Sequence, residues 1–60
     1  MIKQAKDLRA GDGVDHGWYI RCLVSVDFRS GGVDLRWDDG EEEFVTPGSE
    51  FANVVEAGEW

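Results

Sequence analysis

The segment 33–46 constrains the fold of this chain most strongly, because it has the pattern of a β-hairpin. Its first half, 33–38, alternates apolar and polar residues, as expected for a strand with one buried face. The Asp39-Gly40 pair that follows is a strong signal for a two-residue turn, since both central residues must accept positive φ. We therefore predict two antiparallel strands joined at Asp39-Gly40.

This turn predicts the register of the hairpin. Leu35 would face Phe44 on the apolar side, and Val33 would face Thr46. On the polar side Arg36 would face Glu43, a charge pair that contributes a few tenths to about 1 kcal/mol. A slip of one residue would instead set Arg36 against Phe44, so we expect this register to be well specified.

A second strand pattern covers 18–28. Its even positions are apolar: Trp18, Ile20, Cys22, Val24, Val26 and Phe28. A two-residue loop at Ser30-Gly31 would set Phe28 opposite Val33, Val26 opposite Leu35 and Val24 opposite Trp37. Both hairpins then turn the same face of their shared strand inward, which predicts a three-stranded antiparallel meander.

The phase of these strands predicts which side chains are buried. Trp18 and Trp37 fall on the inward side, together with Cys22, for which we expect a core position. Tyr19 falls on the outward side and is predicted to be exposed. Asp27 lies opposite Asp34, and we expect neighbouring arginines, Arg29 and Arg36, to relieve this like-charge pair diagonally.

The remaining segments complete the predicted fold. Pro47-Gly48 ends the third strand of the meander, Ser49–Ala52 forms one short helical turn, and Asn53–Glu56 forms a last strand. For Ala57–Trp60 we expect either fraying or packing of Trp60 onto the body. Five short strands with a helical turn before the last is the order of a small SH3-like β-barrel, and residues 1–60 form a single all-β domain.

Length and composition exclude several classes of protein. A domain of 60 residues buries only about 60% of the surface that its unfolded chain exposes, so it has little room for a deep cleft. The single cysteine, Cys22, cannot form an internal disulfide, and no Cys/His cluster indicates a structural metal. No apolar run or signal-peptide pattern is found, which predicts a cytoplasmic protein that lies in no membrane.

The charge of the chain indicates the kind of partner. The net charge is -7, and a field of this sign disfavours phosphate backbones and anionic membranes while it favours basic partners. Lys3, Lys6 and Arg9 form the one basic cluster. Nucleic acid is therefore an improbable ligand, and a basic protein segment is the expected one.

Several motifs resemble those of a known family. The motifs are Leu35-Arg36-Trp37, Asp39-Gly40, Glu41, Phe44-Val45, Pro47-Gly48 and Asn53-Val54-Val55. They are similar to the V-R-W-x-D-G-x-E-x-x-x-P-G-P-D-x-V pattern of a small actinobacterial family of unknown function with an SH3-like barrel. The opening Asp7–Asp12 resembles the D-L-x-x-G-D start of small barrel proteins of actinobacteria and their phages. The resemblance implies the barrel and a phage or actinobacterial origin, but no activity.

A more distant resemblance is to Tudor-type barrels, which share a V-x-W/F-x-D-G hairpin and bind methylated basic residues in aromatic cages. The rings available here are Trp18, Tyr19, Trp37, Phe44 and Phe51, near Glu42. Small barrels also need large side chains to fill the core, so core packing and a cation-binding cage remain alternatives.

No arrangement in the sequence predicts catalysis. His16 lies in a glycine-rich loop with Asp12 and Asp15, which offers no nucleophile in a shielded site. The acidic run 38–43 lacks the alternating ligand spacing of a calcium-binding loop. We therefore expect neither an enzyme nor a cofactor.

The predicted function is a non-enzymatic interaction module that binds a basic protein segment. The predicted binding residues, on the hairpin tip and the outward face, are Tyr19, Arg36, Asp38, Asp39, Glu41, Glu42 and Glu43. One alternative is a decoy in which the tip carboxylates and Glu50 imitate the phosphates of nucleic acid. Another is a structural component of a phage particle or its assembly.

Overall fold

Strands dominate the computed structural model, which describes residues 1–59; the expectation for Trp60 lies outside the described residues. The elements, in chain order, are β1 (Lys3–Gln4), the 3-10 turn η1 (Ala5–Asp7), β2 (Gly13–Asp15), β3 (Ile20–Arg29), β4 (Gly32–Trp37), β5 (Glu42–Val45), β6 (Glu50–Phe51) and β7 (Val54–Val55). The prediction of an all-β chain is confirmed.

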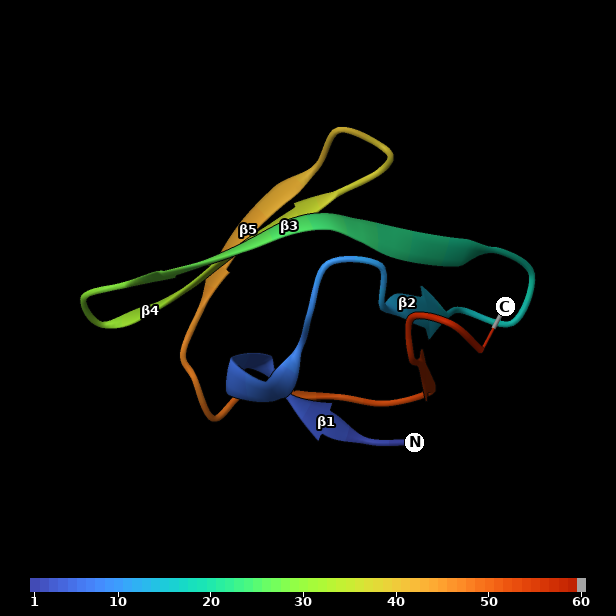
Figure 1. Cartoon of the computed structure of the whole chain (residues 1–60), viewed down its shortest axis with the longest axis horizontal. Coiled ribbons are helices and arrows are strands. Elements are labelled where there is room, and N and C mark those ends of the chain that lie inside the picture. The colour runs from blue at the N-terminus through green and yellow to red at the C-terminus, as the bar shows by residue number, and fades with distance from the viewer. Residues whose placement is uncertain (60) are drawn as a thin grey trace.

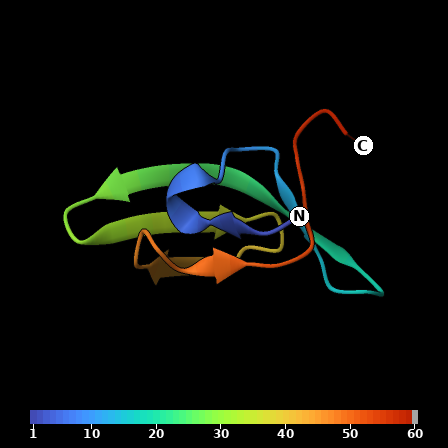
Figure 2. The same ribbon diagram turned by 90° about the horizontal axis from the view of Figure 1, so that it is seen from below.

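The strands form two antiparallel sheets (Figure 1). Five strands pair in the order β5-β4-β3-β2-β7, and β1 pairs with β6. The long strand β3 spans the molecule, and η1 and β1 lie across one face of the larger sheet (Figure 2). The larger sheet has five strands and is not closed on itself, and the β1–β6 pair forms a separate sheet beside it.

The predicted helical turn at Ser49–Ala52 is also wrong, because this segment is extended. Ser49 instead closes a turn with Thr46, accepting or donating a side-chain hydrogen bond of 2.8 Å and donating its N–H to the Thr46 carbonyl at 3.1 Å. The Ser49 carbonyl accepts the N–H of Ala5 at 2.7 Å, which ties the β6 side to η1. Within the described residues, the helical turn lies at η1.

The β3–β4 hairpin follows the predicted register over its outer part. Phe28 pairs with Val33 and Val26 with Leu35, as expected. Asp27 lies opposite Asp34, and the Arg29 guanidinium relieves this contact through an ion pair of 3.2 Å to Asp34. The predicted diagonal help from Arg36 is not found, since that side chain pairs with Glu42.

A register shift between Leu23 and Ser25 inverts the inner part of β3. Leu23, not Val24, pairs with Trp37, and Val24 is the extra residue of a β-bulge. Before the bulge the odd positions face inward, so Leu23 is buried whereas Val24 is exposed. Cys22 is consequently only half-buried. The inward placement predicted for Trp18 is wrong, because Trp18 lies before β3 in the β2–β3 connection and is 89% exposed.

The β4–β5 turn has three residues instead of the predicted two. The N–H of Gly40 donates to the Trp37 carbonyl at 3.1 Å, and the N–H of Trp37 donates to the Glu41 carbonyl at 2.9 Å. Gly40 has φ +91°, as in the three-residue hairpin loop that ends in a left-handed glycine. The extra loop residue moves the register by one position.

The shifted register changes every pair predicted for this hairpin. The observed pairs are Val33 with Val45, Asp34 with Phe44, Leu35 with Glu43, and Arg36 with Glu42. Phe44 is consequently on the outer face, where 58% of it is exposed. Its ring covers Gly32, at which an added Cβ would lie 2.6 Å from Phe44 Cζ. The aromatic ring thus fills the space that the glycine leaves on the sheet.

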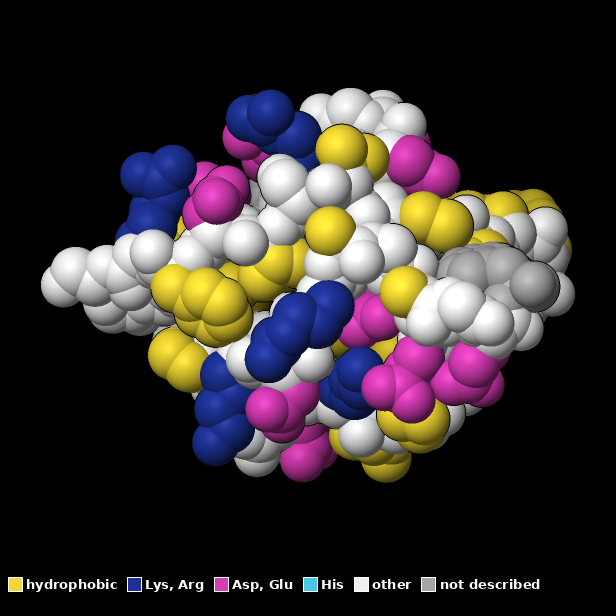
Figure 3. Space-filling model, in the orientation of Figure 1, with side chains coloured by type: hydrophobic (Ala, Val, Ile, Leu, Met, Phe, Trp, Pro, Cys, Tyr) yellow, Lys and Arg dark blue, Asp and Glu magenta, His cyan; other side chains and the backbone are white. Residues whose placement is uncertain are grey.

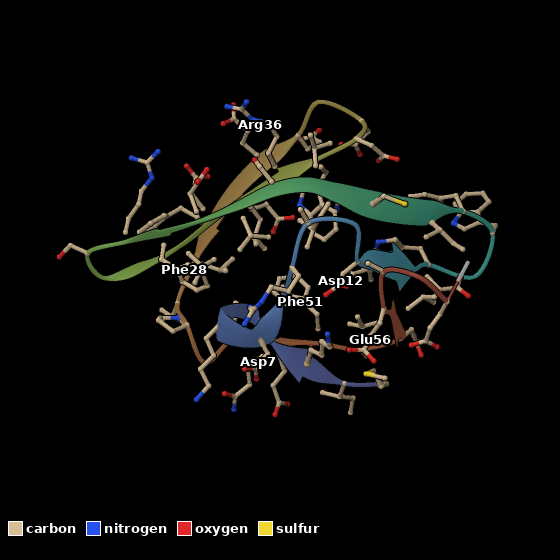
Figure 4. All side chains as sticks on the ribbon, in the orientation of Figure 1. Asp7, Asp12, Phe28, Arg36, Phe51 and Glu56 are labelled. Carbon is tan, nitrogen blue, oxygen red and sulfur yellow. The ribbon has the colours of Figure 1, made fainter. Side chains whose placement is uncertain are left out.

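The core lies between the larger sheet and the β1–η1 segment. Its buried apolar members are Ala5, Leu8, Val14, Leu23, Val33, Leu35, Trp37 and Val54. Phe51 packs at its margin with its ring centroid 6.3 Å from that of Trp37, and Figure 4 shows it between β3 and η1. The core position predicted for Trp37 is confirmed, with only 2% of the residue exposed.

Candidate functional site

The acidic run 38–43 was the first predicted site, and most of its carboxylates serve the fold. Asp38 extends the β3–β4 pairing: its N–H donates to the Cys22 carbonyl at 2.9 Å, and its Oδ1 accepts the Cys22 N–H at 3.3 Å. Asp39 Oδ1 accepts the N–H of Glu41 at 3.0 Å, which stabilises the turn. The carboxylates of Asp38 and Asp39 therefore form intramolecular hydrogen bonds that stabilise the hairpin.

Arg21 forms ion pairs with two carboxylates of the run, Asp39 and Glu43. Its guanidinium lies over the Trp37 ring, 4.3 Å from the centroid. Its Nε lies 3.3 Å from Asp39 Oδ2, an ion pair without hydrogen-bond geometry, and its Nη2 lies 3.5 Å from Glu43 Oε1. Glu43 Oε1 also accepts the Trp37 indole N–H at 2.8 Å. The cation site formed by this ring and these acids is filled by the chain's own arginine.

The other two carboxylates of the run, Glu41 and Glu42, make fewer contacts within the molecule. Glu42 pairs with Arg36 at 3.2 Å, and both side chains are more than half exposed. Among the described residues, the Glu41 side chain makes no ion pair or hydrogen bond. Arg36 points away from the interior (Figure 4). Glu43 shares the inward face with Leu35, so the predicted surface of Tyr19, Arg36 and Glu43 is not assembled.

The aromatic residues do not form the cage that was one of the alternatives. Trp37 and Phe51 belong to the core, and Phe44 lies on the outer face of the sheet. Trp18 and Tyr19 lie together in the β2–β3 connection, with ring centroids 6.0 Å apart. Core packing therefore accounts for one pair of rings, and a second exposed pair remains.

The β2–β3 connection presents this exposed pair on an ordered loop. The His16 N–H donates to the Tyr19 carbonyl at 2.9 Å, and Asp15 Oδ1 accepts the Gly17 N–H at 2.7 Å. Gly17 has φ +96°, a conformation that favours glycine. The His16 ring stacks on Tyr19 at 4.8 Å and 15°, and Trp18 is 89% exposed. We call residues 15–20 the aromatic tip.

A hollow of about 540 Å³ lies beside the aromatic tip, lined by Asp15, His16, Gly17 and Asn53. Asn53 has φ +57°, and its carbonyl accepts the Asp15 N–H at 3.0 Å, so the two segments are held together. In Figure 3, apolar and acidic side chains gather at the end of the molecule where β2 and β3 connect, whereas the visible Lys and Arg side chains lie elsewhere. The exposed position predicted for Tyr19 is confirmed, with 49% of it exposed.

Asp12, for which the sequence predicted only a loop position, is a buried carboxylate that ties several segments together. It is 2% exposed and accepts the N–H groups of Arg9 at 3.0 Å and Ala57 at 2.9 Å, and the Lys3 ammonium at 3.2 Å. Lys3 also pairs with Glu56 at 2.8 Å. Figure 4 shows Asp12 and Glu56 near each other, where the first loop meets the C-terminal segment.

The pKa shifts of this network follow from its contacts. Burial alone would raise the pKa of the Asp12 carboxyl, but the hydrogen bonds from Ala57 and Arg9, with Lys3, hold that pKa below its ordinary value. The pKa of the Lys3 ammonium is raised, mainly by its hydrogen bond to Glu56 and to a smaller extent by that to Asp12. Burial opposes this effect and lowers the same pKa. Both shifts favour the charged forms, which is the signature of a structural ion network.

Comparisons with protein-family models, with curated proteins and with solved structures gave no match. Among residues 1–59, no group of three or more His, Cys, Asp and Glu side chains is placed to hold a metal ion. In the same part of the chain, no helix has the length and apolar character needed to cross a bilayer. The aromatic tip and the hollow beside it are the candidate site because they combine exposed rings, a hydrogen-bonded loop and a lined depression.

Proposed function

We propose that the protein is a non-enzymatic interaction module that binds a basic segment of a partner protein through the aromatic tip. The observation that carries this proposal is the 89% exposure of Trp18 on a loop whose backbone is fixed by hydrogen bonds. Tryptophan and tyrosine are enriched among the residues that dominate binding energy, because they bury a large area at little entropic cost. An exposed, preorganised Trp18–Tyr19 pair fits that role.

The electrostatic field supports a basic partner. The net charge of -7 attracts cations over long range, and the aromatic faces attract them at short range. The carboxylates of the acidic run still contribute to this field, although most of them are engaged by Arg21, Arg36 or the backbone. In this proposal they steer the partner and do not form its contact surface.

We also propose that the architecture is SH3-like and that the protein acts in the cytoplasm. The β3–β4–β5 meander and the return of β7 to pair with β2 support the former. An actinobacterial or phage origin is proposed on the resemblance of residues 35–55 alone. Function as a nucleic-acid-mimicking decoy or as a phage structural component is supported by no specific contact among residues 1–59.

The test is a titration of the isotope-labelled full chain with a basic peptide in which arginine and lysine alternate with serine, followed by NMR. Amide shifts should change in residues 15–20 and at Asn53, and remain unchanged in 42–45. Trp18→Ala should abolish these changes, whereas Phe28→Ala, at a ring 62% exposed and far along β3, should not. Shifts confined to 38–43 would refute the aromatic tip as the contact surface.

A pull-down from a cell lysate with the full chain and with Trp18→Ala addresses the decoy. Capture of a DNA-binding protein that duplex DNA displaces, with no dependence on Trp18, would replace the proposed function by that alternative.

A further inference from the structure

We infer that the hollow beside the aromatic tip holds an arginine side chain of the partner; this inference rests on the proposed function and names the group recognised. The lining residues Asp15, His16, Gly17 and Asn53 combine one carboxylate, one amide and one flat ring. A guanidinium is planar, permanently charged and carries five N–H donors. The following contacts match these properties.

The hollow is lined by hydrogen-bond acceptors that have no partner among the described residues. Asp15 uses Oδ1 to accept the Gly17 N–H at 2.7 Å, and within the described residues its Oδ2 makes no hydrogen bond or ion pair. The Asn53 side-chain amide likewise has no partner in that part of the chain, and its oxygen is an acceptor. Two acceptors on adjacent segments suit the forked donors of a guanidinium, because charge-assisted hydrogen bonds to carboxylates are about twice as strong as neutral ones.

In this inference the guanidinium stacks on the ring of His16, a residue that lines the hollow. This ring is ordered by its stack on Tyr19, with 15° between the ring planes. Guanidinium groups stack on aromatic faces, whereas an ammonium offers only a point charge. The same chain shows this arrangement inside, where Arg21 lies 4.3 Å above Trp37 and within ion-pair distance of Glu43.

The segments around the hollow supply no cation of their own. Residues 10–20 and 50–59 contain no Lys or Arg, yet they carry Asp12, Asp15, Glu50, Glu56 and Glu59. Two cations lie beside these segments, and both have partners: Lys3 is bound to Asp12 and Glu56 at 3.2 and 2.8 Å, and the N-terminal ammonium of Met1 donates to the Val54 carbonyl at 3.2 Å. Asp15 has no ion pair among the described residues, so its charge is available to a cation of the partner.

Two substitutions test the acceptors without disturbing the loop. Asp15→Asn removes the charge and keeps an oxygen that can accept the Gly17 N–H. Asn53→Gly removes the amide and tolerates the positive φ at this position. Glu41→Gln is the matched control, because it removes an equal charge from a side chain that makes no contact in the described structure.

The probes are three fluorescein-labelled peptides with identical serine- and glycine-rich sequences, which carry arginine, lysine or citrulline at one set of positions. Citrulline keeps the shape of arginine and removes its charge. Binding to the full chain is measured by fluorescence anisotropy at two salt concentrations. Circular dichroism and amide spectra confirm that each variant is folded.

The arginine peptide should bind at least about tenfold more tightly than the lysine peptide, and the citrulline peptide should not bind, as expected when a charge-assisted hydrogen-bond pair is lost. Asp15→Asn should lower the affinity for the arginine peptide about tenfold, and Asn53→Gly severalfold. Glu41→Gln should change it less than about twofold, since it acts only through the long-range field.

Equal binding of the arginine and lysine peptides, unaffected by Asp15→Asn and Asn53→Gly but abolished by Trp18→Ala, would overturn this inference and leave the proposed function intact. Binding of none of the peptides would overturn both. An equal loss in Asp15→Asn and Glu41→Gln would overturn the site as well, because it would show that only net charge matters.

Discussion

The guanidinium of Arg21 lies 4.3 Å from the centroid of the Trp37 ring on the inward side of the sheet. The β-bulge at Val24 places Arg21 there by inverting the phase of the first half of β3. Asp39 and Glu43 neutralise its charge at 3.3 and 3.5 Å. An arginine at an inward position is thus stabilised by a ring face and two carboxylates, which links the acidic turn to the core.

This contact predicts that the two strand arginines differ in their effect on stability. Arg21→Ala should lower the free energy of unfolding by about 1–3 kcal/mol, because it removes a partly desolvated cation–π contact and leaves Glu43 without its cation. Arg36→Ala should cost less than about 0.5 kcal/mol, since its side chain is 60% exposed against 18% for Arg21. Urea unfolding measures both, and equal losses would contradict the role given to Arg21.

The two tryptophans are expected to behave in opposite ways. Trp37→Ala should cost about 3–5 kcal/mol, which rivals the whole stability of a small domain, because the ring fills the core. Trp18→Ala should change stability by no more than about 0.5 kcal/mol, since Trp18 is 89% exposed. Thermal melts decide this, and a large loss in Trp18→Ala would show that its ring packs against the body in solution.

Local patterns in the sequence were sufficient to predict the outer part of the β3–β4 hairpin. The Ser30-Gly31 turn and the alternation around Val26 and Phe28 are short-range signals, and they gave the correct pairs. The bulge at Val24 has no such signal, because the apolar residues continue through it. It is favoured instead by distant contacts, such as the two hydrogen bonds between Asp38 and Cys22.

The candidate site was predicted only in part, for a similar reason. Strand phase was applied to Trp18 and Tyr19, but both lie in the β2–β3 connection before β3 begins. Tyr19 is exposed as predicted, whereas Trp18, predicted to face inward, is the more exposed ring. Carboxylate density pointed to the turn 38–43, whereas the partners of those carboxylates are set by β3 across the sheet. Asp12 was overlooked because the contact that buries it against the C-terminal segment, the N–H of Ala57, comes from 45 residues away in the sequence.

Two glycines should resist substitution for different reasons. At Gly32 an added Cβ would lie 2.6 Å from both Phe44 Cζ and the Val45 carbonyl oxygen, so Gly32→Ala must push β5 away. At Gly40 the surrounding space is open, but φ is +91°, so Gly40→Ala should cost only about 1–2 kcal/mol of backbone strain. Gly32→Ala should be the more damaging in thermal melts.

A double variant separates the two contacts at Gly32. Adding Phe44→Ala removes the ring conflict and leaves the backbone conflict with Val45. Recovery of full stability in Gly32→Ala with Phe44→Ala would show that the backbone of β5 yields easily, contrary to our expectation.

The Asp12 network predicts how stability depends on pH. The folded-state pKa of Asp12 lies below its ordinary value of 3.8, so its contribution is fully present above that pH and is lost as the pH falls below it. The pKa of Lys3 is raised above 10.5, so its contribution is present below that pH and is lost as the pH rises further. Asp12→Asn should lower stability near neutral pH by about 1.5–3 kcal/mol and flatten the acid limb of the profile of melting temperature against pH. If Asp12→Asn and the parent lost melting temperature equally as the pH fell below 3.8, the lowered pKa of Asp12 would be contradicted.

The carboxylates of the acidic run 38–43 should differ in how much they contribute to stability. Replacing Glu41 and Glu42 together by Gln should change the melting temperature little, because Glu41 has no partner among the described residues and the Glu42–Arg36 pair is exposed. Glu43→Gln keeps an acceptor for the Trp37 indole but removes the charge beside Arg21, so it should cost about 1 kcal/mol. Equal melting temperatures for the parent, the double variant and Glu43→Gln would refute this difference.

The same variants separate steering from contact once a basic peptide is shown to bind. The Glu41→Gln, Glu42→Gln variant should slow association at low salt, because long-range attraction raises the rate of encounter. The difference from the parent should shrink as salt rises, since the Debye length falls from about 10 Å at 0.1 M to about 3 Å at 1 M. Dissociation should stay unchanged in this variant and become faster in Tyr19→Ala, whose ring lies in the aromatic tip. Stopped-flow measurements at two salt concentrations give the association and dissociation rates. Faster dissociation in the Glu41→Gln, Glu42→Gln variant would show that the acidic run 38–43 contacts the peptide directly.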